Sequence, residues 1–224
     1  MAVGELAERL PAISVVRRWS QSLAVLDAII CEDRQYRYFC FDSQFAPGRA
    51  LASMCNGEGD EHSITFTGDG AFMRGFDHES PLSPFAQTPP SLWPGLLTGL
   101  PEALAVAARE PAFTLEGVAL MTVALWRLAG DQQWCHGPVT FPRSWQREYA
   151  DPDGSGWLFA QLDGHADSYL EYASNYFERR LPGEAVTAVI DHEPITAALL
   201  RTLNPQRLPD DLTNDLNQIG YPAQ

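Results

Sequence analysis

Apolar residues that recur at steps of three and four positions predict the helices of this chain. The clearest stripe lies within residues 13–30 and ends at the polar segment Cys31-Glu32-Asp33-Arg34. Its members are Ile13, Val16, Trp19, Leu23, Leu26 and Ile30. Weaker patterns predict further helices over residues 102–109, 170–181, 194–203 and 208–219.

Short aromatic, β-branched or alternating runs predict strands at residues 36–41, 51–55, 62–67, 71–76, 118–126, 133–136 and 185–190. Within residues 62–67 apolar and polar side chains alternate, so that strand is expected to have one solvated face. Residues 118–126 are apolar at successive positions and predict a central strand buried on both faces. The turn signals Asn56-Gly57 and Gly68-Asp69-Gly70 favour antiparallel pairing of their neighbours.

The order of these elements predicts the fold class. Helix, meander, helix, hairpin and then helices do not alternate regularly, which indicates an α+β protein. We expect a single domain over residues 1–224, with a largely antiparallel sheet packed against an N-terminal helix and C-terminal helices. The proline-rich segment 80–101 carries too many large apolar residues for a linker and is expected to fold back over the core.

Charge changes the expected range of partners. The chain has 29 acidic and 15 basic residues, a net charge of −14, and all of its basic residues are arginine. Such a field repels nucleic acids and anionic membranes and attracts basic proteins or cations. We therefore expect neither nucleic-acid nor membrane binding.

The N-terminus lacks a basic segment followed by an apolar run, and no apolar stretch is long enough to span a bilayer. Cys31, Cys40, Cys55 and Cys135 show no C-x-x-C spacing, which favours reduced thiols. Together these features predict a cytoplasmic protein.

Acidic residues gather at the predicted hairpin ends. Like charges so placed repel one another unless a cationic group relieves them. They predict a surface that binds a basic protein partner, and the competing interpretation is a merely solvated loop. The residues of this predicted surface are Glu58, Asp60, Glu61, Asp69 and Asp77.

One tripeptide occurs twice, as Asp77-His78-Glu79 and as Asp191-His192-Glu193. Imidazole and carboxylate are ligands for zinc, iron or manganese, so Asp77, His78, Glu79, Asp191 and His192 are the candidates for a metal site. A metal-dependent hydrolase, with a carboxylate as base, is the alternative function. The spacing of a metal motif is absent, which favours acids that cap backbone amides or lie in a solvated loop. No cofactor is therefore predicted.

Other catalytic and ligand motifs are incomplete. Asp151-Pro-Asp153-Gly-Ser155-Gly156 resembles the first half of a calcium loop, but Leu162 stands where the bidentate glutamate belongs, which favours a plain turn. G-x-S-x-G and phosphate-binding glycine loops are missing. Whether the chain is an enzyme stays open, and the missing signatures favour a binding protein.

Segments 57–84 and 204–222 carry GEGDEHSITFT, GAFMRGFDHESPLSP and LNP…DDLTNDLNQIGYP, and LWPGLL lies between them. They resemble a family of uncharacterised cytosolic bacterial proteins similar to the immunity proteins of secreted antibacterial toxins. The resemblance implies a small α+β inhibitor or accessory protein and assigns no functional residue. We therefore expect an acidic, immunity-type protein that neutralises a basic toxin domain by occluding its surface; the partner's identity and the oligomeric state stay open.

Overall fold

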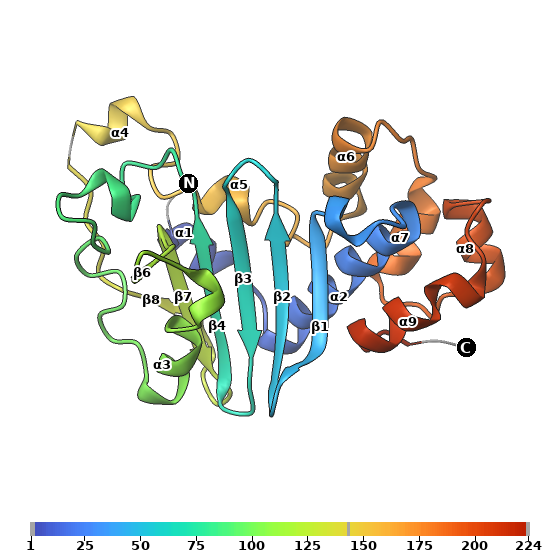
Figure 1. Cartoon of the computed structure of the whole chain (residues 1–224), viewed down its shortest axis with the longest axis horizontal. Helices are drawn as coiled ribbons and strands as arrows, with labels where there is room; N and C mark the ends of the chain where they lie inside the picture. The colour runs from blue at the N-terminus through green and yellow to red at the C-terminus, as the bar shows by residue number, and fades with distance from the viewer. Residues whose placement is uncertain (1–2, 143, 223–224) are drawn as a thin grey trace. The chain divides into compact units, whose positions relative to one another are not determined.

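The computed structural model describes residues 3–142 and 144–222, and it contains both helices and antiparallel strands (Figure 1). Its helices are α1 (Val3–Arg9), α2 (Ile13–Ile30), α3 (Glu102–Ala108), α4 (Trp145–Glu148), α5 (Ser155–Leu158), α6 (Ala166–Tyr176), α7 (Gly183–Ile190), α8 (Ala197–Leu203) and α9 (Pro209–Ile219). Its strands are β1 (Phe39–Ala46), β2 (Arg49–Cys55), β3 (Glu61–Phe66), β4 (Gly70–Phe76), β5 (Thr114–Leu115), β6 (Val118–Ala119), β7 (Val123–Leu128) and β8 (Cys135–His136). The predicted α+β class with an antiparallel sheet is confirmed.

Contacts within the chain group it into two compact units. The first unit is Met1–Ile13 with Cys55–Phe159, and the second is Ser14–Met54 with Ala160–Gln224. The boundary of a single domain over residues 1–224 stays a prediction.

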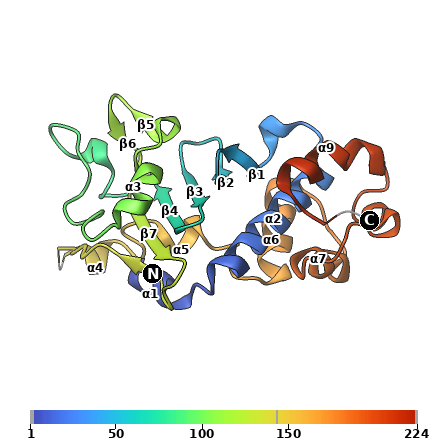
Figure 2. The ribbon, with the colours of Figure 1, turned by 90° about the horizontal axis from the view of Figure 1, so that it is seen from below.

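In the first unit, β3, β4, β7 and β8 pair in that order, each antiparallel to its neighbour. Helix α3 and the β5–β6 ribbon lie on one side of β4 and β7, and α1 with α5 lies on the other (Figure 2). Strand β4 is buried along its whole length as a result. The sheet of this unit is therefore the middle layer of three.

The expectation of a solvated face on residues 62–67 is wrong. Every residue of β3 from His62 to Phe66 is buried, including Ser63 and Thr65. The polar face is covered because the adjacent strand turns the side chain of Arg74 onto it. That guanidinium donates to Ser63 Oγ at 3.0 Å and to the Leu120 carbonyl at 2.6 Å, and it lies 3.6 Å from the centre of the Phe113 ring. These contacts hold residues 113–120 against the polar face of the sheet.

The single strand predicted over residues 118–126 is divided in two. Val118 and Ala119 belong to the β5–β6 ribbon, which Leu120 closes by donating its amide to the Phe113 carbonyl at 2.9 Å. Thr122 then donates its amide to the Gly75 carbonyl at 2.7 Å, where the chain joins the main sheet as β7. The predicted partner at residues 133–136 is confirmed as β8.

In the second unit, α2 is buried on all sides from Ser20 to Ile30, so this part is a core helix, whereas its first turns are amphipathic, with Ser14 and Arg18 exposed and Val16 buried. Helices α6, α7 and α9 lie around it (Figure 2). Buried polar side chains of α2 bind the later segments: Gln21 Nε2 donates to the Ile219 carbonyl at 2.9 Å and Ser22 Oγ to the Val189 carbonyl at 2.6 Å. The C-terminal helices are therefore held to α2 by hydrogen bonds as well as by apolar packing.

Asp27 is a fully buried carboxylate at the centre of the second unit. Its oxygens accept hydrogen bonds from the amides of Tyr38 and Phe39, both at 2.9 Å, and from the hydroxyls of Tyr169 at 2.7 Å and Tyr172 at 3.2 Å. Burial raises the pKa of Asp27 to about 6, although the four hydrogen bonds act in the opposite direction. This one side chain connects α2, the start of β1 and α6.

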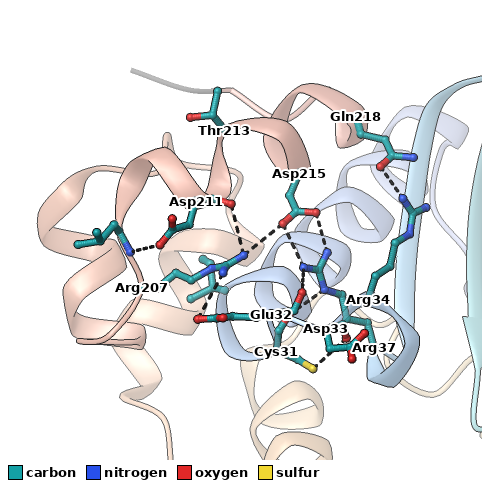
Figure 3. Close-up of polar contacts among 12 residues, drawn as sticks. Cys31, Glu32, Asp33, Arg34, Arg37, Arg207, Asp211, Thr213, Asp215 and Gln218 are labelled. Atoms are coloured by element: carbon teal, nitrogen blue, oxygen red, sulfur yellow. Dashed lines mark hydrogen bonds and ion pairs between the residues drawn. The ribbon is translucent and has the colours of Figure 1, made fainter.

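A second polar cluster fixes α9 (Figure 3). The guanidinium of Arg37 makes two hydrogen bonds to Asp215, at 2.7 and 3.1 Å, and also donates to the Cys31 carbonyl at 2.8 Å. Arg34 donates to Gln218 Oε1 at 2.6 Å. The last helix is thereby anchored to the segment between α2 and β1.

The predicted strand at residues 185–190 is wrong, because this segment is helix α7. Its buried residues, Ala185, Val186, Val189 and Ile190, are spaced as one face of a helix. The other helices are confirmed with shifted ends, since α6 covers residues 166–176 and α8 begins only after its N-cap, Thr196. In the first predicted strand, residues 34–36 form a 3₁₀ turn, and β1 starts at Phe39.

Two bulk expectations can be compared with the structure. Within residues 3–142 and 144–222, no helix combines the length and the apolarity that crossing a bilayer requires. The four cysteines are free thiols, with Cys31 and Cys40 partly buried and Cys55 and Cys135 exposed.

Candidate functional site

Three loops of the first unit meet at one end of its sheet, and we call them the acidic end. They are residues 56–60 between β2 and β3, residues 77–80 after β4, and residues 151–157 around the start of α5. The first two carry the predicted acidic hairpin end and the first D-H-E tripeptide, and the third is the D-P-D-G-S-G motif. Three features that were separate in the sequence are thus one site.

Asp60 links the first two loops and is only 6% exposed. One of its carboxylate oxygens accepts hydrogen bonds from the His78 amide at 2.8 Å and from His78 Nδ1 at 2.7 Å, and the other accepts from Asn56 Nδ2 at 2.7 Å. Burial acts to raise the pKa of Asp60, but the bonds from His78 and Asn56 lower it overall. The same contact raises the pKa of the His78 imidazole.

Asn56 orders the tip of its own loop. Its side-chain oxygen accepts hydrogen bonds from the amides of Glu58 at 2.8 Å and Asp60 at 3.1 Å. Glu58 itself is exposed, and the side chain of Glu79 across the gap is 86% exposed. Hydrogen bonds from Asn56 and Asp77 thus order the backbone of two residues whose carboxylates are exposed.

Asp77 joins the second loop to the third. Its Oδ1 accepts hydrogen bonds from the amides of Glu79 at 3.0 Å and Ser80 at 3.1 Å, and its Oδ2 accepts from Trp157 Nε1 at 3.0 Å. The Trp157 side chain remains 40% exposed. Asp77 thus caps a turn, as the competing interpretation of the tripeptide expected, and positions an exposed indole.

The third loop is folded by its own aspartates. Asp151 Oδ2 accepts hydrogen bonds from the amides of Gly156 at 2.8 Å and Trp157 at 3.2 Å, and Asp153 Oδ1 accepts from Ser155 at 2.9 Å. Burial, followed by the nearby Asp153 carboxylate, raises the pKa of Asp151. Both carboxylates serve the turn that the incomplete calcium motif was expected to form.

The structure divides the predicted partner-binding residues. Glu58, Asp60 and Asp77 lie at the acidic end, and Glu61 lies beside it with its carboxylate 2.6 Å from Arg74 Nη2. Asp69 belongs to the turn at the opposite end of the β3–β4 hairpin, since β3 runs from Glu61 to Phe66 between them. A strand of this length separates its ends by about 17 Å. Asp69 is therefore not part of the acidic end.

The metal candidates do not assemble into a ligand set. Among the described residues, no group of three or more His, Cys, Asp or Glu side chains could hold a metal ion. Asp191 is the C-cap of α7, and His192 takes the left-handed backbone conformation (φ 67°) that follows the helix. His192 lies against Tyr221, with ring centroids 4.3 Å apart, and burial lowers its pKa.

Two important residues of this region were missed from the sequence. Trp157 was passed over because nothing local distinguishes an exposed indole from a core one. Arg74 stands in an apolar strand, where a lone charged residue signals a buried, paired guanidinium. Its side chain is 2% exposed and it pairs with Glu61.

Comparison with known proteins adds no relative. No protein-family model matches this chain, and neither the curated proteins nor the solved structures contain a match to it. The resemblance to immunity proteins remains a prediction, and function has to be argued from the acidic end itself.

Proposed function

We propose that this chain is a cytoplasmic, acidic binding protein of the immunity type. It neutralises a basic protein partner, such as a toxin domain, by occluding the partner's surface. The contact surface is the acidic end, where Glu58, Glu79 and Trp157 face the partner. The buried Asp60 and the partly buried Asp77 support the loops that carry these three.

The observation that carries this proposal is the prior ordering of the loops that carry the exposed groups. Asp60, Asn56 and Asp77 already hold the three loops through hydrogen bonds of 2.7–3.1 Å. Ordering loops and side chains on association costs free energy, so a surface that is ordered beforehand binds more tightly for the same contacts.

The chemistry of the exposed groups also fits a basic partner. Carboxylates in a chain of net charge −14 speed the approach of a cationic protein. Trp157 supplies the kind of large, rigid side chain that dominates binding energy at the centre of interfaces. Steering would set the association rate, and the indole would set the dissociation rate.

The test uses the purified chain as bait for basic proteins in a lysate of its native host. The captured protein is identified, and its binding rates are measured for the wild type and for a Glu58→Gln/Glu79→Gln variant. We expect the double variant to associate roughly tenfold more slowly at low salt, with the difference lost at high salt. Trp157→Ala should instead raise the dissociation rate.

A variant of equal net charge provides the control. Asp69→Asn/Glu102→Gln removes two exposed carboxylates of the first unit that lie outside the three loops of the acidic end, and it should change the association rate much less. If both double variants behave alike, general charge rather than this surface governs the encounter. If association is insensitive to salt in every variant, the steering mechanism is wrong.

The hydrolase alternative has no comparable support. His78 is engaged by Asp60, and the described residues contain no set of three metal-binding side chains. We therefore do not propose an enzymatic function.

A further inference from the structure

A groove of about 660 Å³ opens in the first unit, between the 92–97 loop, the end of α3 and the β5–β6 ribbon. This volume lies within the roughly 300–1,000 Å³ of small-molecule sites. Most of the wall is apolar or uncharged. Its main lining residues are Leu92, Leu97, Ala108, Arg109, Val118 and Ala119.

The groove stands on a rigid base. Beneath it lies a buried cluster that includes Leu96, Leu104, Met121 and Trp126, and Leu92, Leu97 and Ala119 pack against this cluster. The ribbon wall is fixed by Arg74, through the Leu120 carbonyl and the Phe113 ring. A ligand would therefore meet a site that is already formed, which lowers the cost of binding.

Arg109 is the one formally charged side chain among the described residues that line the groove. It is exposed, and no hydrogen bond or ion pair joins its guanidinium to another side chain that the structure describes. Two other arginines of the first unit are engaged: Arg74 binds Glu61, and Arg127 binds the Asp131 carbonyl. An unengaged guanidinium beside an apolar wall is suited to a carboxylate, which it can hold with two parallel hydrogen bonds.

We infer that this groove binds a small apolar molecule with a single carboxylate, of the class of medium-chain fatty acids. The hydrocarbon part lies along Leu92, Leu97 and Val118, where it is removed from water. The carboxylate pairs with Arg109 at the end of α3. This site is separate from the acidic end, and the inference does not depend on the proposed protein partner.

The test compares three ligands that share one chain length: decanoate, decanol and decylammonium. Each is titrated below its micelle concentration into ¹⁵N-labelled full-length protein. Amide shifts report the location, and their saturation reports the dissociation constant. We expect decanoate to shift amides of residues 92–97, 108–109 and 114–119 and to bind roughly tenfold more tightly than decanol. Decylammonium should bind least.

Two variants separate the head-group contact from the groove. Arg109→Gln should remove the preference for decanoate over decanol, whereas Arg201→Gln, at an exposed arginine of α8, should preserve it. Thr114→Trp places a large ring in the groove wall and should abolish binding of all three ligands. Thr187→Trp, on an exposed position of α7, should leave binding intact.

Several results would overturn the inference. One is equal affinity for decanoate and decanol, and another is a decanoate preference that survives Arg109→Gln. Saturable shifts confined to other parts of the protein, or no saturable binding by any ligand, would equally refute it. Unchanged unfolding midpoints of the variants confirm that a loss of binding is not a loss of fold.

Discussion

Gly154 lies directly against the side chain of Asp77. A Cβ atom added to this glycine would stand 2.7 Å from Asp77 Cβ and 2.8 Å from Asp77 Oδ2, closer than such atoms can approach. Gly154 also has a φ of 79°, in the left-handed region that glycine favours. The contact shows that the third loop fits the second only because residue 154 has no side chain.

Gly154→Ala should therefore destabilise the protein by about 3–4 kcal/mol, because backbone strain and the clash with Asp77 act together. Gly48→Ala is the matched control, since Gly48 has a φ of 70° but nothing within 4 Å of an added Cβ. It should cost only about 1–2 kcal/mol. Urea unfolding gives both values, and equal losses would contradict the close packing of the two loops.

Breaking the Arg37–Asp215 ion pair of the second unit should lower the free energy of unfolding strongly (Figure 3). The Arg37 side chain is 7% exposed and that of Asp215 is 19% exposed. Arg37→Gln leaves the carboxylate with Arg207 alone, at 3.4 Å. Because a half-buried charge loses its main partner, we expect a loss of about 3 kcal/mol in the free energy of unfolding.

Arg34→Gln tests whether the loss of stability comes from the Arg37–Asp215 ion pair itself. Arg34 is exposed and donates to Gln218 at the surface, so its removal should cost about 0.5 kcal/mol or less. Chemical denaturation of both variants under identical salt decides the point. Similar losses would mean that the segment, rather than the ion pair, sets the stability.

His62 predicts a loss of stability in acid. Its ring is buried, with Nδ1 2.6 Å from the Leu158 carbonyl, and burial lowers its pKa to about 4. The unfolded chain takes up a proton near pH 6.5, whereas the folded protein does so only near pH 4. The contribution of His62 is therefore complete above about pH 6.5 and falls by about 3 kcal/mol as the pH drops toward 4. His62→Asn, which keeps a donor for Leu158, should lose this pH dependence in denaturation curves.

The raised pKa of Asp27 predicts the opposite dependence of stability on pH. Burial raises its pKa to about 6, so the folded protein holds a proton that the unfolded chain has released. Stability from this group is complete below about pH 4 and falls by about 3 kcal/mol as the pH rises to 6. Asp27→Asn should remove this fall in stability. The rise in stability with pH that is due to His62 should then remain.

The two slopes nearly offset each other between pH 4 and 6 in the wild type. Relative to the wild type, the single variants should therefore change the slope in opposite directions, whereas the double variant should nearly keep the wild-type slope. Denaturant unfolding at half-unit steps of pH provides this comparison. Parallel curves for all four proteins would show that neither group has the shifted pKa on which the argument depends.

Long periodic segments were the predictable part of this fold. The stripes of α2 and α9 extend over 18 and 11 residues, and both helices lie where the pattern places them. The prediction of a strand at residues 185–190 was wrong because a short run of apolar and β-branched residues matches a buried strand as well as a buried helix face. The predicted strand 118–126 is interrupted at residues 120–122 because Leu120 and Thr122 bond to Phe113 and Gly75. A local sequence pattern does not show these partners.

The candidate site was predictable in its parts and not in its assembly. The tripeptide at residues 77–79 and the turn at residues 151–156 were each recognised as turn formers. Their meeting rests on contacts between Asp77 and Trp157, 80 positions apart. The exclusion of Asp69 did have a sequence signal, because successive loops of a meander lie at alternating ends of the sheet.

Arg74 links the acidic end to the groove. The same guanidinium binds Glu61, next to the acidic end, and the Leu120 carbonyl, directly after the groove-lining residues Val118 and Ala119. Opening of the ribbon releases Glu61 in the same event, so amide hydrogens at both places should exchange with solvent in a single cooperative step. A molecule seated in the groove would slow that step and stiffen the loops at the far side of the same side chain.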